Sequence, residues 1–170
     1  QFWFDPATAR ILHSDARVAL KSSDQRFDVI VGDAFTDIAA PEHLVTQEFF
    51  ELVSNRLSSD GVFAMNLIDN MDRLEALAAV VVTLRSVFPS VEVWTAAGPP
   101  QPGERRVFVL LASATDSPVS SVETRTPDLT RFQVLDTGFI DAILAQKNAR
   151  ILTDDHAPLA YLMGFDPAVD

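Results

Sequence analysis

The feature that most constrains the fold is a short apolar run at residues 27–31 (FDVIV), which is followed at once by Gly32 and Asp33. The run is rich in β-branched side chains and lacks a regular alternation, which is typical of a strand buried on both faces of a parallel sheet. In open α/β sheets, ligands bind just beyond the carboxyl ends of such strands. The sequence therefore predicts an α/β fold, with Asp33 and the nearby Asp37 where that fold carries out its chemistry.

Strands and helices are expected to alternate along most of the chain. Apolar runs predict strands at 10–14, 27–31, 62–68, 91–95 and 106–112, and apolar spacing predicts helices at 16–21, 41–57, 69–88 and 139–147. Alternation of this kind favours a mostly parallel sheet, whereas the short link between the last two strands requires an antiparallel hairpin at one edge. Residues 115–130, rich in Ser, Thr, Pro and Asp, are expected to be a surface connection within one domain.

The composition excludes several classes of function. The 170 residues carry 24 acidic and 13 basic side chains, a formal net charge of −11, so nucleic-acid binding is not expected and a cationic partner is favoured. The absence of cysteine excludes disulfides, zinc–thiolate sites and cysteine nucleophiles. No apolar stretch reaches the ~18 residues that a membrane span needs, so no membrane contact is expected. Glycine-rich phosphate loops and serine nucleophile elbows are also absent. These features fit a cytoplasmic protein.

Each candidate site residue also has a structural interpretation. Asp33 and Asp37 could grip or deprotonate an amine, or they could cap a turn and face solvent. Asp15 could accept hydrogen bonds from an exocyclic amine such as that of adenine, although an N-cap of the following helix is favoured. Residues 154–156 (Asp-Asp-His) could supply metal ligands or an acid–base pair. However, the three histidines have no ligand spacing, so we expect a charged turn and no metal site.

Three segments together resemble the spermidine synthase family, the polyamine aminopropyltransferases, and more broadly the class I S-adenosylmethionine-dependent methyltransferase-like fold. Residues 13–20 (HSDARVAL) resemble the family's GDA segment after a strand. Residues 27–50 resemble its YDVIIxDxxD…PxxLxxxxFF catalytic segment, and residues 151–162 (ILTDDHAPLAYL) resemble the LTDDxAPxEYL ending of bacterial members. The resemblance spans most of the chain and implies a Rossmann-like, methyltransferase-type sheet.

The resemblance also implies a reaction and its residues. The reaction is the transfer of an aminopropyl group from decarboxylated S-adenosylmethionine, a co-substrate and not a tightly bound cofactor, to a diamine such as putrescine. A base is needed because a protonated amine has no lone pair with which to attack. Asp33 would be that base. The other residues implied are Asp15, Ala16, Pro41 and Leu44 on the adenine side of the donor, and Asp37 and Asp155 for the amine substrate.

The sequence departs from the family pattern at several points. The family's two acids are spaced Asp-x-x-Asp, whereas three residues separate Asp33 from Asp37, and Ala160 stands where the ending usually carries Glu. Tyr161 is the single tyrosine, so the family's amine-site tyrosines have little counterpart. Two other hypotheses therefore stay open. One is a methyltransferase of the same fold that uses S-adenosylmethionine, and the other is a catalytically silent domain for nucleoside binding or assembly.

The family's first strand, with its glycine-rich donor loop, and its second strand have no counterpart in the sequence. We therefore expect residues 1–170 to be the C-terminal portion of a spermidine synthase-like domain that lacks its first two strands. Exposed strand edges would then pair with more of the polypeptide or with another chain. A homo-oligomer, a dimer above all, is expected from the family's habit. Sizing of the purified protein tests this, and a stable monomer of this mass alone would contradict it.

Overall fold

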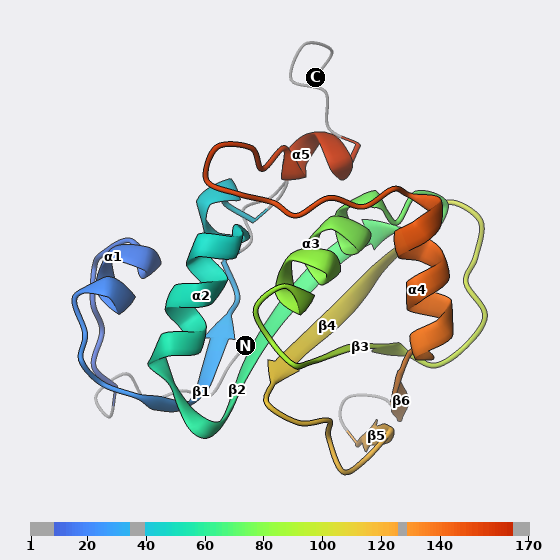
Figure 1. The fold of residues 1–170 in the computed structure, drawn as a ribbon. Helices are drawn as coiled ribbons and strands as arrows, with labels where there is room; N and C mark the ends of the chain where they lie inside the picture. The colour runs from blue at the N-terminus through green and yellow to red at the C-terminus, as the bar shows by residue number, and fades with distance from the viewer. Residues whose placement is uncertain (1–8, 35–39, 126–128, 165–170) are drawn as a thin grey trace.

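The computed structural model describes residues 9–34, 40–125 and 129–164. Within these residues it contains a six-stranded sheet with the strand order β1-β2-β4-β3-β6-β5 (Figure 1). The strands are β1 Phe27–Gly32, β2 Leu57–Asn70, β3 Ser90–Ala96, β4 Arg105–Ser113, β5 Ser121–Thr124 and β6 Thr130–Val134. The helices are α1 Ala16–Lys21, the 3-10 turn η2 Glu42–Leu44, α2 Gln47–Arg56, α3 Glu75–Arg85, α4 Thr137–Gln146 and α5 Leu159–Leu162.

The sheet is mixed. β1 pairs with β2 in parallel, with Val31 opposite Ala64. The described pairs β2–β4, β3–β4, β3–β6 and β5–β6 are all antiparallel. The α/β class is therefore confirmed, but the expectation of a mostly parallel sheet is corrected within the described residues. The predicted antiparallel hairpin of β3 and β4 is present, yet it lies inside the sheet because β6 pairs with the free side of β3.

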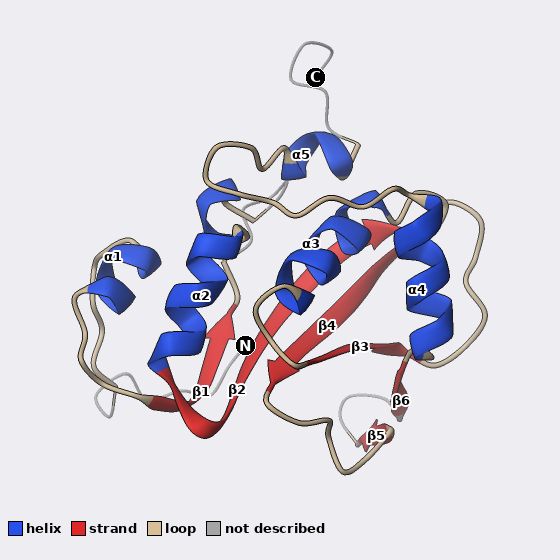
Figure 2. Ribbon diagram, in the orientation of Figure 1, coloured by secondary structure: helices blue, strands red, loops and turns tan. Residues whose placement is uncertain are grey.

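The core lies between one face of the sheet and the helices α2, α3 and α4 (Figure 2). Side chains of β2 alternate, so that Phe63, Met65 and Leu67 are buried against the helices while their neighbours in the strand are only partly covered. Helix α3 is apolar on nearly all sides and buries eight of its residues. A helix of that composition needs cover all round, which the sheet and the neighbouring helices supply.

The strand at the centre of the sequence argument is not buried on both faces. Val29 and Val31 are 61% and 67% exposed, whereas Ile30 is partly buried against the core. The physical reason is that β1 is an edge strand of the described sheet, and its face opposite the helices has no described cover. Residues 10–14, expected to form a strand, form none and pair with no described strand.

Two predicted helices begin later than expected, the first at a capping side chain and the second where a long strand ends. The helix expected at 41–57 is divided: Pro41 precedes η2, and Thr46 then caps α2 by accepting a hydrogen bond from the Phe49 backbone N–H at 3.2 Å. The helix expected at 69–88 begins only at Glu75, since β2 continues to Asn70. Helix ends are where such caps decide the boundary.

Two further findings concern the rest of the chain. The segment 115–130, expected to be a surface connection, includes the short strand β5 and the first residue of β6. Among the residues that the structure describes, no helix is both long and apolar enough to cross a membrane.

Candidate functional site

A cavity of about 270 Å³ lies at the carboxyl end of β1. Its walls come from the end of β1, helix α1, the turn η2, helix α2 and the adjacent strand β2. The residues that line it are Ala16, Leu20, Ile30, Val31, Gly32, Asp33, Ala34, Ala40, Leu44, Phe49, Phe63 and Met65. Asp33 is the single charged residue in this lining. The cavity therefore presents one carboxylate beside an otherwise apolar surface.

Gly32 shapes the floor of this cavity. A Cβ atom at this position would lie 3.1 Å from the Phe63 ring, which is closer than such contacts normally are. The glycine thus lets the Phe63 ring pack against the end of β1, next to the point where Asp33 leaves the sheet. The sequence Val-Gly-Asp therefore ends the strand and presents the carboxylate beside an aromatic floor.

Asp33 is exposed and lies on the cavity wall. Among the described residues, none forms a hydrogen bond or an ion pair with the Asp33 carboxylate. A carboxylate in this state is able to accept a proton or to bind a cationic group. Asp37, the second acid of the predicted pair, lies outside the described residues.

Asp15 and Ala16 have different surroundings. Ala16 lines the cavity, whereas Asp15 caps α1 by accepting a hydrogen bond from the Val18 N–H at 3.0 Å. The second Asp15 oxygen lies 2.7 Å from His43 Nε2. Hydrogen bonding to His43 is the main cause that holds the pKa of Asp15 below its usual value. The N-cap interpretation of Asp15 is therefore confirmed, and a role toward adenine stays a prediction.

The remaining predicted residues lie in two places. Leu44, almost fully buried, lines the cavity, but Pro41 is not part of its lining. Asp155 belongs instead to a second, polar cavity of about 530 Å³. This polar cavity is lined by Arg17, Glu42, His43, Thr46, Asp154, Asp155 and Ala157. Residues adjacent in the sequence line the two cavities. Ala16 and Leu44 line the apolar cavity, whereas their neighbours Arg17 and His43 line the polar cavity.

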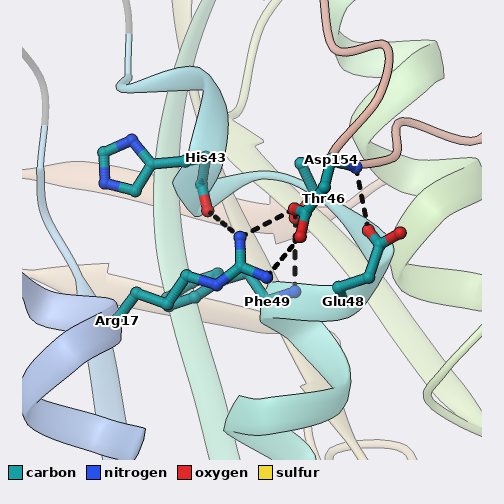
Figure 3. A network of polar contacts seen from close by, with 6 residues as sticks. All are labelled: Arg17, His43, Thr46, Glu48, Phe49 and Asp154. Atoms are coloured by element: carbon teal, nitrogen blue, oxygen red, sulfur yellow. Dashed lines mark hydrogen bonds and ion pairs between the residues drawn. The ribbon is translucent and has the colours of Figure 1, made fainter.

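The polar cavity contains a network that sequence reasoning missed (Figure 3). Arg17 donates two hydrogen bonds to Asp154, at 2.7 and 2.6 Å, and Thr46 donates one to the same carboxylate at 2.8 Å. The three segments resembling the family contain these residues, but nothing in a single sequence pairs residues 17 and 154. The turn expected at residues 154–156 is present, and it is closed by an isolated bridge between Thr153 and His156. The described residues include no group of three or more acidic or histidine side chains placed to hold a metal ion.

Comparison with known proteins gives a consistent result. The family model "Spermine/spermidine synthase domain" matches residues 3–120. The polyamine aminopropyltransferase of Vibrio vulnificus is 29% identical over 167 residues, which cover 92% of this chain and 54% of that protein.

Solved structures give the same fold. A probable spermidine synthase from Corynebacterium glutamicum aligns with a TM-score of 0.64 and 26% identity, covering 81% of this chain and 52% of its own. A spermidine synthase in complex with the transition-state analogue AdoDATO aligns with a TM-score of 0.52 at 22% identity, covering 65% of this chain and 38% of its own; this likeness shows the fold alone. The chain thus spans about half the length of the Vibrio vulnificus and Corynebacterium glutamicum relatives.

Proposed function

The chain belongs to the spermine/spermidine synthase family, and on that premise we propose that its cavity at the end of β1 serves aminopropyl transfer. The donor is decarboxylated S-adenosylmethionine and the acceptor is a diamine such as putrescine. The observation that carries the proposal is the position of Asp33, the one charged residue in the lining of an otherwise apolar cavity at the end of a parallel strand. Such a cavity suits a donor with an apolar nucleoside face, and its carboxylate suits an attacking amine that needs a base.

The donor's nucleoside would lie against the apolar wall. Ala16 of α1 and Leu44 of η2 both line the cavity and would offer apolar contact to a purine. Asp15 would accept a hydrogen bond from the exocyclic amine, since each carboxylate oxygen has a second lone pair beside those used by Val18 and His43. Pro41, just before η2, would support Leu44 from outside the cavity.

Asp33 would act on the acceptor. Asp33 takes a proton from the ammonium group of the acceptor, the freed nitrogen lone pair attacks the aminopropyl methylene carbon bound to the sulfonium, a C–N bond forms, and the C–S bond breaks. Methylthioadenosine leaves as a neutral thioether, and the product carries the positive charge as a secondary ammonium. A positioned base of this kind typically contributes about 10²–10⁴ in rate. Asp37 and Asp155 would add negative charge for the far amino group of a diamine, in keeping with the net charge of −11.

The decisive experiment supplies decarboxylated S-adenosylmethionine and putrescine and measures methylthioadenosine. We expect turnover by the protein and a loss of about 10²-fold or more in Asp33→Asn, because the amide is no base. Asp60→Asn, an exposed acid of β2 remote from the cavity lining, serves as the control and should retain turnover. Unchanged turnover in Asp33→Asn would exclude its role as base.

The same assay separates the other hypotheses. Methyl transfer from S-adenosylmethionine without aminopropyl transfer would indicate a methyltransferase of this fold. Binding of methylthioadenosine without turnover of either donor would indicate a silent nucleoside-binding domain. A cytoplasmic location is proposed with the function, on the family assignment alone.

A further inference from the structure

We propose that Asp154 is a positioning residue for the candidate site, because its carboxylate clamps Arg17 of α1 to Thr46 at the start of α2. The clamp fixes the spacing between the two helices that wall the apolar cavity. The inference rests on the proposed function, in that the spacing matters for a nucleoside bound in that cavity. Asp154 itself lines the neighbouring polar cavity and does not line the apolar one.

The contacts are specific. Arg17 donates from both terminal nitrogens to the two Asp154 oxygens, at 2.7 and 2.6 Å, in the paired geometry that a guanidinium and a carboxylate favour. Thr46 Oγ1 donates to Asp154 Oδ1 at 2.8 Å, and the Asp154 backbone N–H donates to Glu48 at 3.0 Å. Figure 3 shows the Arg17 guanidinium between the Asp154 carboxylate and the His43 carbonyl, to which it donates at 3.3 Å.

The clamp lies directly behind both walls of the cavity. Arg17 follows Ala16, which lines the cavity from α1. Thr46 stands between Leu44 and Phe49, which line it from η2 and α2, and Thr46 also accepts the first capping hydrogen bond of α2 from Phe49. The Asp154 carboxylate thus accepts hydrogen bonds from Arg17 of α1 and from Thr46 at the start of α2. A shift in the spacing of the walls changes the width of the cavity without touching its lining.

Helix α1 depends on such polar contacts more than the other helices do. It contains no buried residue, whereas α2, α3 and α4 each bury at least two. Its C-terminal end is tied to α2 by Arg56 Nε, which donates to the carbonyl of Leu20 at 3.0 Å. The N-terminal end of α1 is held by the Arg17–Asp154 pair and by the contact of Asp15 with His43 at 2.7 Å, and of these two only the pair also reaches Thr46 at the start of α2. Loss of the pair should loosen that end while the core stays packed.

The experiment measures the dissociation constant of methylthioadenosine by calorimetric titration. Asp154→Asn keeps the side chain's shape and an acceptor for Thr46 but removes the charge. Arg17→Lys keeps the charge but removes the paired donors. We expect each variant to weaken binding about tenfold, and the double variant to weaken it no further, because both changes break one interaction. The turnover number at saturating donor should remain near that of the unaltered protein, which distinguishes positioning from catalysis.

A matched control is available on the other side of the molecule. Asp141 of α4 pairs with Arg85 of α3 at 2.5 Å, with side chains 58% and 29% exposed, against 42% and 26% for Asp154 and Arg17. Asp141→Asn therefore removes a comparable ion pair between two helices that do not wall the cavity. It should leave the dissociation constant of methylthioadenosine unchanged.

Hydrogen exchange of the free protein gives a readout that needs no ligand. The backbone amides of α1 should exchange faster in Asp154→Asn and not in Asp141→Asn. Unchanged exchange in α1, or unchanged binding by Asp154→Asn, would overturn the clamp and leave the proposed function standing. If the unaltered protein binds no methylthioadenosine while α1 loosens in Asp154→Asn, the proposed function fails, and with it the positioning role.

Discussion

Asp33 and Asp154 are both exposed aspartates near one edge of the sheet, yet their surroundings give them different tasks. Asp33 faces an apolar cavity and has no described partner. Asp154 has three side-chain donor contacts, two from Arg17 and one from Thr46. A carboxylate saturated with donors holds structure, whereas one without partners is available to a substrate. The role of Asp155 in substrate binding stays a prediction, and the sequence analysis did not predict the contacts that the neighbouring Asp154 makes with Arg17 and Thr46.

The pH dependence of stability tests the state of Asp154. The hydrogen bonds from Arg17 hold the pKa of Asp154 below its ordinary value of 3.8. A carboxylate with a lowered folded-state pKa stabilises the fold above the unfolded value, and this stabilisation is lost as the pH falls through the folded value. We expect the difference in unfolding free energy between the unaltered protein and Asp154→Asn to be at most about 1 kcal/mol at pH 7, since the pair is half-exposed. Urea titrations at successively lower pH should show that difference shrink below pH 3.8. A difference that stays constant down to the lowest pH would contradict the account.

Asp69 shows how a polar residue inside an apolar pattern escapes sequence reasoning. It continues β2, is 1% exposed, and accepts hydrogen bonds from the Asn70 and Leu77 backbone N–H groups at 2.7 and 2.8 Å. Burial raises the pKa of this carboxyl group, whereas the hydrogen bonds from the two N–H groups act to lower it. The Asp69 side chain thereby gives the Leu77 backbone N–H, in the first turn of α3, a hydrogen-bond acceptor. A sequence read residue by residue assigns the same Asp to the first turn of the helix.

We expect Asp69→Ala to lower the unfolding free energy by about 1–3 kcal/mol, because two backbone donors lose their partner and the Leu77 donor is buried. Asp60→Ala, at an exposed position of the same strand, should change it by less than about 0.5 kcal/mol. Denaturant titration of both variants measures the difference, and equal values for the two would contradict a capping role for Asp69.

At the scale of the elements, composition predicted which segments become strands and helices better than it predicted their surroundings. The run at 27–31 forms β1 as expected, but the sequence carries no signal for which strands lie beside it, and β1 is an edge of the described sheet. The sequence likewise did not predict the break between η2 and α2 at Thr46, because the apolar spacing continues through this residue. Local pattern fixes periodicity, while neighbours and caps depend on tertiary contacts.

A matched pair of substitutions tests the exposure of β1. Val31 of β1 is 67% exposed and Val93 of β3 is 2% exposed, and both lie in strands. Valine and threonine have the same shape and similar strand preference, so Val→Thr mainly reports the cost of burying a hydroxyl group. We expect Val93→Thr to cost about 1–3 kcal/mol of unfolding free energy and Val31→Thr less than about 0.5 kcal/mol. Comparable losses in thermal or urea unfolding would mean that Val31 is covered in the protein in solution.

At the scale of the whole molecule, the resemblance in three segments identified the family, and the structure places two of them at one cavity. Ala16, Asp33 and Leu44, from the first two segments, line the same cavity. The third segment contributes through Asp154, from behind the walls, which no spacing in the sequence reveals. The chain spans about half the length of the two relatives described above, so the complete reaction is proposed for the protein and not for these elements alone. A dimer stays a prediction that sizing of the protein tests.

The central claim is that the cavity at the end of β1 holds a nucleoside with its reacting end toward Asp33. A crystal structure of the protein grown with methylthioadenosine tests it most directly. We expect the purine between Ala16 and Leu44, its exocyclic amine toward Asp15, and the methylthio group on the side of Asp33. Methylthioadenosine bound at any other place, or oriented with its sulfur away from Asp33, would contradict the claim.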